Sequence, residues 1–78
     1  MDIITTMSRE ERNAELRERI MDLRDQRYSI YKIISALEDK QAFHPDRFSA
    51  DDQYWLRYHK SDVARIKAEE ARLRSLIH

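Results

Sequence analysis

Residues 43–49 read Phe-His-Pro-Asp-Arg-Phe-Ser and contain the only proline of a 78-residue chain that has no glycine. Proline and glycine mark most turns, so this stretch is where the chain is expected to reverse. The residue before a proline avoids the helical region, which places the end of a preceding helix before His44. With so few turn residues elsewhere, the composition favours a few long helices over a sheet.

The chain is predicted to be one all-α, helical-hairpin domain of residues 9–78, in which a helix over 9–42 and a helix over 50–77 are joined by a loop over 43–49. Residues 1–8 are expected to form an N-terminal tail and the N-cap of the first helix. The apolar residues of this tail either fold back onto the helices or stay disordered, and they are Ile3, Ile4 and Met7.

Both predicted helices carry start signals. Ser8, with Glu11 three residues later, has the pattern of a capping box, in which each side chain serves a free backbone amide. Ser49 is the corresponding N-cap of the second helix. Asp51 and Asp52 follow it, and their charges suit the positive end of the helix dipole.

Apolar side chains recur along each predicted helix at alternating spacings of four and three residues, the pattern of helices that pack side by side. The seam of the first helix consists of Leu16, Ile20, Leu23, Arg27, Ile30, Ile34, Leu37 and Gln41. The seam of the second consists of Asp52, Leu56, His59, Val63, Ile66, Glu70, Leu73 and Ile77. Folding the chain at the loop brings both seams into one antiparallel register, whose facing residues include Ile30 with Val63, Leu37 with Leu56 and Gln41 with Asp52.

A chain of this size rarely builds a sufficient core from one seam. We therefore expect two hairpins to associate into a homodimeric four-helix bundle. Small residues that would allow another helix to approach recur along the second helix, and they are Ser61, Ala64, Ala68, Ala71 and Ser75. The alternative is that the alanines are good helix formers on a solvated face.

Polar residues also stand in the seams away from the loop, and they are Arg27, His59 and Glu70. Arg27 and Glu70 lie about one helical turn apart in the register and are predicted to form a partly buried ion pair, which adds little stability but penalises slipped registers. An arginine held for a ligand or a phosphate is the alternative. His59 is predicted to flank the core rather than to bind a metal, because the histidines lack the spacing of a helical metal site. No metal and no cofactor are expected.

All the aromatic residues lie between positions 28 and 58, in the half of the hairpin next to the loop. Phe43 and Phe48 are expected to pack the hairpin end. Exposed aromatic and arginine side chains are the types that anchor protein interfaces. We therefore predict a partner-binding surface at the loop end, made of Arg47, Tyr54, Trp55, Arg57, Tyr58 and Lys60.

The composition disfavours an enzyme, because a chain without glycine lacks a phosphate-cradling loop, and no nucleophile with its base stands out. No stretch approaches the roughly 20 apolar residues of a membrane span, and the cytoplasm is the expected compartment. We expect a non-enzymatic interaction protein that binds another macromolecule, with a protein as the favoured partner, and blocks or bridges it. Small accessory proteins of phages and plasmids, including inhibitors, are of this kind.

Nucleic-acid binding is the alternative. A dimeric hairpin resembles in architecture the plasmid RNA-binding hairpins of the Rop type, which implies a basic face on the first helix. Lys and Arg number 15, as do Asp and Glu, so the chain lacks the basic excess of most nucleic-acid-binding proteins. Acidic residues also interrupt the candidate basic stripe of Arg12, Arg19 and Lys32, and they are Glu15, Glu18 and Asp22.

Overall fold

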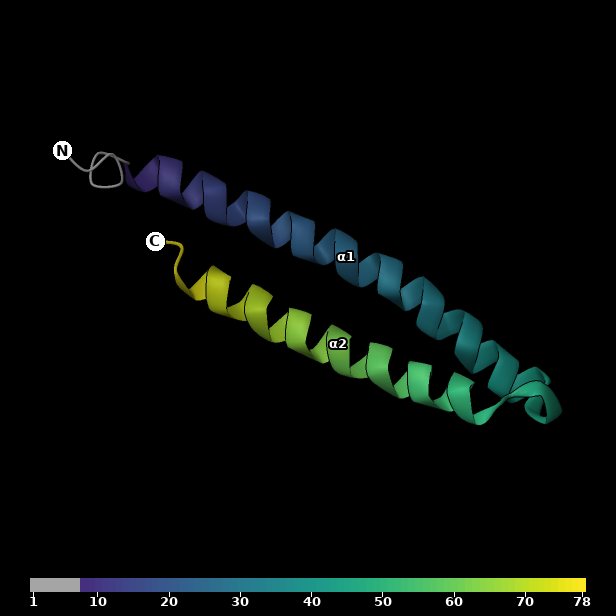
Figure 1. The fold of residues 1–78 in the computed structure, drawn as a ribbon. Helices are drawn as coiled ribbons and strands as arrows, with labels where there is room; N and C mark the ends of the chain where they lie inside the picture. Colours follow the sequence, from purple (N-terminus) through teal and green to yellow (C-terminus); the bar gives the residue numbers. More distant parts are fainter. Residues whose placement is uncertain (1–7) are drawn as a thin grey trace.

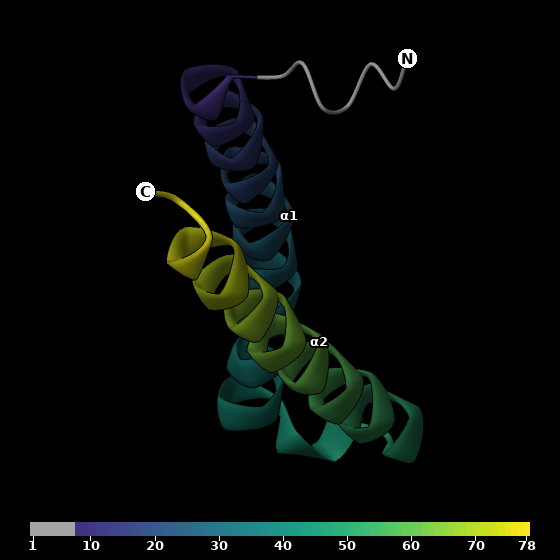
Figure 2. The same ribbon diagram turned by 90° about the vertical axis from the view of Figure 1, so that its left-hand side faces the viewer.

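The computed structural model describes residues 8–78 and shows a helical hairpin (Figure 1). Helix α1 runs over Arg9–Phe43, the short 3-10 helix η2 over Pro45–Arg47, and helix α2 over Ala50–Ser75. The two long helices lie side by side in opposite directions and cross at an angle (Figure 2). The hairpin measures 62 Å along its length and 17 Å in each other direction. The predicted all-α hairpin is confirmed.

Capping defines the start of each helix. The Ser8 hydroxyl accepts a hydrogen bond from the Glu11 amide at 3.1 Å. At α2 the capping box is complete, because the Asp52 amide donates to the Ser49 hydroxyl at 3.1 Å and the Ser49 amide donates to the Asp52 carboxylate at 3.0 Å. Helix α1 ends one residue later than predicted and α2 ends two residues earlier, within the usual fraying of helix ends.

The expectations for the tail concern Ile3, Ile4 and Met7, which lie outside the described residues. The described chain begins at Ser8, the N-cap of α1.

The two predicted seams face each other along the hairpin. Every seam position of α2 is buried or half-buried, whereas most seam positions of α1 are only half-buried. The buried apolar side chains of the core are Ile34, Leu56, Val63, Ile66 and Leu73, and the first three form a cluster toward the loop. Half-buried Ile30 and Leu37 pack against it. The antiparallel register read from the sequence thus describes how the helices meet.

Two expectations at the loop end are wrong. Gln41 is exposed, and Lys40 instead reaches Asp52, with its Nζ 2.8 Å from the carboxylate. A cation gains more from that carboxylate than an amide would. Phe43 does not pack the hairpin end, because it is 75% exposed. Since α1 continues through Phe43, the ring points about 200° around the helix from Gln41. Phe48 does pack against the core cluster.

The open end of the hairpin is tied by a residue that sequence reasoning missed. Asn13 is 6% exposed, and its amide nitrogen donates to the main-chain oxygen of His78 at 2.7 Å. The signal was present, because Asn13 precedes Leu16 by three residues and so continues the alternating spacing of the α1 seam. A short polar side chain at that position joins the end of the chain to the first turns of α1.

Candidate functional site

Three exposed aromatic rings gather on the first turns of α2, and we call Tyr54, Trp55 and Tyr58 the aromatic cluster. Their exposed fractions are 61%, 50% and 47%. The rings of Tyr54 and Tyr58 stack with centroids 6.4 Å apart, and the Trp55 ring meets both edge-on at 5.2 and 5.6 Å. Because each ring is supported by the others, the cluster presents a broad apolar surface with restricted side-chain freedom.

His59 lies at the base of the aromatic cluster. It is half-buried on the α2 seam, and its ring centroid is 6.0 Å from that of Trp55 and 5.5 Å from that of Tyr58. Its Nδ1 atom is buried and makes no hydrogen bond to the residues that the structure describes. His59 thus supports the exposed rings from the seam beneath them.

The start of α2 is anchored two residues before the cluster. Asp52 accepts from both Lys40 of α1 and the Ser49 amide. The hydrogen bond from Lys40, followed by that from Ser49, holds the pKa of Asp52 below its ordinary value. The Asp52 carboxylate therefore both caps the start of α2 and holds it against α1. Tyr54 follows two residues later, so the first residue of the aromatic cluster lies on an anchored helical turn.

The structure does not bring all the predicted partner-binding residues together. Arg57 lies three residues after Tyr54 and so beside it on the helix. Lys60 lies two residues after Tyr58, about 200° around α2, which places it on another side. Arg57 and Lys60 line a separate shallow recess of about 230 Å³. Arg47 is exposed in η2. The aromatic part of the predicted surface is one cluster, and its basic part is divided.

Arg27 and Glu70 form a two-point ion pair in the middle of the hairpin. The Arg27 Nε donates to one Glu70 oxygen at 2.8 Å, and an Nη donates to the other at 3.2 Å. Glu70 is 2% exposed and Arg27 17% exposed at the side chain. The hydrogen bond to Glu70 is the main reason that the pKa of Arg27 lies above its ordinary value. The Glu70 carboxylate occupies the Nε and Nη donors of Arg27 with which the guanidinium would bind a phosphate. This geometry favours a structural ion pair over a ligand-binding arginine.

Two tyrosines of α1 surround this pair. The Arg27 guanidinium carbon lies 5.6 Å from the Tyr28 ring centroid and 5.9 Å from that of Tyr31. The Lys67 ammonium of α2 also lies 5.9 Å from the Tyr31 ring. Hydrogen bonding by Lys67, and next by Arg27, lowers the pKa of Tyr31. These contacts add cation–π attraction to the ion pair, and they tie Tyr31 to both helices.

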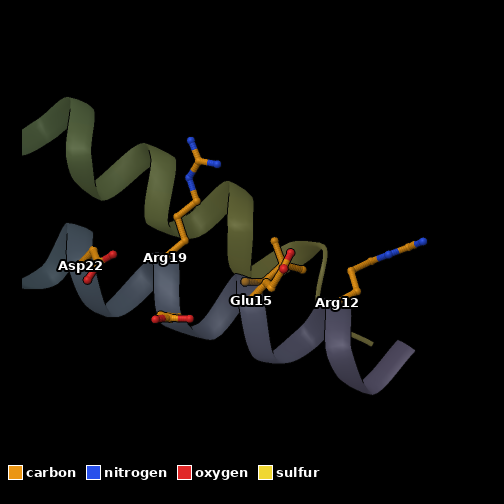
Figure 3. Close-up of a pocket in the computed structure, with 6 residues that line it drawn as sticks. Arg12, Glu15, Arg19 and Asp22 are labelled. Carbon is orange, nitrogen blue, oxygen red and sulfur yellow. The ribbon is translucent and has the colours of Figure 1, made fainter. Parts of the chain in front are cut away.

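The candidate basic face on α1 is a mixed surface. A shallow recess of about 360 Å³ is lined by residues of α1 alone, among them Arg12, Glu15, Arg19 and Asp22. Figure 3 shows Glu15 between the two arginines and Asp22 beyond Arg19. A phosphate chain following this helix would meet carboxylates as often as guanidinium groups, which weakens the electrostatic attraction that such binding needs.

Across residues 8–78, no three acidic or histidine side chains are placed to hold a metal ion. In the same part of the chain, no helix combines the length and the apolar character needed to cross a membrane. Comparison of the chain with protein-family models, with curated proteins and with solved structures finds no match.

Proposed function

We propose that this is a small cytoplasmic, non-enzymatic interaction protein that binds another protein through the aromatic cluster and thereby blocks or bridges it. The observation that carries the proposal is the set of mutually stacked, half-exposed rings of Tyr54, Trp55 and Tyr58. An exposed aromatic surface has a cost in water, and burial of such a surface under a partner recovers it.

The chemistry of the cluster favours a protein partner. Tyrosine and tryptophan supply large contact areas while few rotamers are lost, and their polar groups can still meet water or a hydrogen-bond partner at the edge. Arg57 lies next to Tyr54 and provides a donor group at the rim. The surface therefore combines an apolar centre with a polar border, as interfaces between proteins commonly do.

Nucleic acid is the weaker alternative for this chain. Binding to a phosphate backbone needs several uninterrupted cations, whereas arginines and acids alternate along the α1 recess. Aromatic stacking on unpaired bases would also need a basic path beside the rings. Lys60, which is the nearest lysine in sequence, lies on another side of α2 from Tyr58.

Affinity capture with the immobilised full chain tests the proposal. Proteins captured from the source cell by the wild type are compared with those captured by Tyr54→Ala/Trp55→Ala and by Tyr28→Ala. Tyr28 is a matched control, because it is a 53% exposed tyrosine on α1. We expect the double variant to lose the captured partner by tenfold or more, which is about 1.4 kcal/mol, while it keeps its helicity. We expect Tyr28→Ala, which removes cation–π contacts with Arg24 and Arg27, to capture as much partner as the wild type.

A partner that is retained by Tyr54→Ala/Trp55→Ala would contradict the proposed surface. A captured nucleic acid whose binding falls steeply with salt, and weakens modestly with each basic substitution, would instead support the alternative.

A further inference from the structure

A second stripe runs along α2, about 100° around the helix from its seam with α1. Its residues follow alternating spacings of four and three, and we call them the α2 stripe: Tyr58, Asp62, Arg65, Glu69, Arg72 and Leu76. The two ends of the stripe are exposed apolar side chains, with Tyr58 47% and Leu76 44% exposed. Such spacing is the pattern of a helix that packs against another helix.

The charges of the α2 stripe are self-complementary in one direction only. In an antiparallel copy centred on residue 67, Asp62 faces Arg72, Arg65 faces Glu69 and Tyr58 faces Leu76. A two-fold axis repeats each of these contacts, so all the charged contacts join opposite signs. In a parallel copy each residue would face itself and every charged contact would join like signs, which is unfavourable.

Within one chain these charges already pair along the helix. Arg65 contacts Asp62, and an Arg72 Nη lies 2.6 Å from a Glu69 oxygen. The arginines keep much of their exposure, with 76% and 60% at the side chain. An approaching copy therefore meets ordered charges of alternating sign without first breaking contacts to α1.

The stripe also forms one wall of a groove between the two helices. The groove has a volume of about 620 Å³ and is lined by Asp62, Arg65, Glu69 and Arg72 together with Leu23 and Ile66. Leu23 is only half-buried in the single hairpin. A helix that packs on the stripe covers this groove and removes further apolar surface from water, which supplies the affinity that exposed ion pairs alone do not.

From this geometry we propose that the α2 stripe is the interface at which two copies of the chain pair, with the two α2 helices antiparallel about a two-fold axis that passes midway between Arg65 and Glu69. The charges set the direction and register of the pair, and Tyr58, Leu76 and half-buried Leu23 supply apolar contact. This goes beyond the binding of another protein and does not depend on it.

The proposed register leaves most of the aromatic cluster free. Since Tyr58 faces Leu76 at the end of the partner's helix, the part of α2 that precedes Tyr58 extends past that end. Tyr54 and Trp55 therefore remain exposed in the dimer, once at each extremity. The pair presents two separated copies of the surface that we propose for partner binding.

Charge-segregated variants test the interface. The acidic-stripe variant is R65E/R72E, and the basic-stripe variant is D62R/E69R. Alone, each should self-associate on the order of a hundredfold more weakly than the wild type, because every attractive contact becomes repulsive. Mixed in equal amounts they should recover a heterodimer. R17E/K32E is the matched control, because it makes the same charge change as R65E/R72E at exposed α1 positions and should dimerise like the wild type.

Sedimentation equilibrium gives these constants, and circular dichroism checks that each variant is helical. A second pair of variants keeps the charges and tests the direction. The chain has no cysteine, so Y58C and L76C should oxidise to a covalent dimer when mixed and much less when either is alone. The proposal is overturned by a wild type that stays monomeric at several hundred micromolar, by charge variants that dimerise like the wild type, or by cysteine dimers that form equally well unmixed.

Discussion

Glu70 is the most deeply buried charged residue that the structure describes, and Arg27 neutralises its charge. A carboxylate that is 2% exposed loses its hydration, and the two-point contact with Arg27 compensates for that loss. The pair occupies seam positions at which apolar residues would otherwise pack. It therefore fixes the register of the hairpin more than it adds to stability.

We predict that single and double substitutions of this pair differ in their effect on stability. Glu70→Ala should lower the melting temperature by several degrees, because it leaves Arg27 unpaired on the seam. Arg27→Met/Glu70→Leu should lower it less, or raise it, because no charge remains at that layer. Thermal unfolding followed by circular dichroism gives the comparison. Equal melting temperatures for the two variants would show that the pair is unimportant to the seam.

Asp52 carries a pH dependence whose sign follows from its contacts. The pKa of Asp52 is lowered in the folded chain, first by Lys40 and then by Ser49. The contribution of Asp52 to stability is therefore fully present above the pKa of an aspartate in the unfolded chain, about 3.9. It is lost as the pH falls through the lower pKa that Asp52 has in the folded chain. Asp52→Asn should be less stable than the wild type at neutral pH and should lose less stability on acidification.

Melting temperatures measured from pH 7 down to pH 2 test this expectation. Asp39→Asn makes the same chemical change at an exposed position of α1 and should keep the acid dependence of the wild type. If the melting temperature of Asp52→Asn instead falls with pH in parallel with that of the wild type, Asp52 does not contribute to the acid dependence of stability.

At the scale of the elements, α2 is held more firmly than α1. The seam of α2 is buried at Leu56, Val63, Ile66 and Leu73, whereas α1 buries Ile34 and leaves its other apolar seam positions half-exposed. In the described part of the chain each long helix is covered mainly by the other, so side chains that point away from the seam stay exposed. The outward positions of α1 consequently contribute little to stability.

Substitutions along these two faces should differ accordingly. Leu73 is 3% exposed, and Leu73→Ala should cost about 2–5 kcal/mol, because it removes buried methyl groups and leaves a cavity. Met21 is 54% exposed, and Met21→Ala should change stability by no more than about 0.5 kcal/mol. Urea unfolding at one fixed protein concentration measures both, and similar costs would mean that the seam of α2 has been misidentified.

The seams and their antiparallel register were predictable because a strict alternation of four and three residues can be read without knowing the fold. The same spacing extends to Asn13, which was overlooked because a polar residue does not stand out in an apolar pattern. Phe43 was misplaced because α1 persists to Phe43, and hydrophobicity does not fix where a helix ends. Gln41 was misplaced because Lys40, one residue earlier, reaches Asp52 instead.

The candidate site was predictable only in part. Tyr54, Trp55 and Tyr58 follow one another at helical spacing and therefore cluster, as proximity in the sequence suggests. Arg57 and Lys60 are equally close in sequence, but rotation along α2 turns Lys60 to another side. Proximity along a helix is not proximity on its surface, and the direction of each side chain has to be considered residue by residue.

Over the whole molecule, the aromatic cluster, the α2 stripe and the charged recess of α1 follow one another along the length of the hairpin. The aromatic cluster lies near the loop, the α2 stripe occupies the middle and far parts of α2, and the charged recess of α1 lies toward the open end. In the proposed dimer the two aromatic clusters lie at opposite extremities. A molecule of that form is suited to bridge two copies of a partner, and one hairpin alone is suited to cover a single site.

Site-specific photo-crosslinking at the aromatic cluster shows directly whether these rings contact a second protein. Tyr54 is replaced by benzoylphenylalanine in the full chain, Tyr28 is replaced in a control, and both proteins are irradiated in the source cell. We predict that the variant at position 54 crosslinks to a distinct second protein and that the variant at position 28 does not. Crosslinks confined to the chain itself at position 54, or the same second protein at position 28 alone, would contradict the claim that the aromatic cluster is the binding surface.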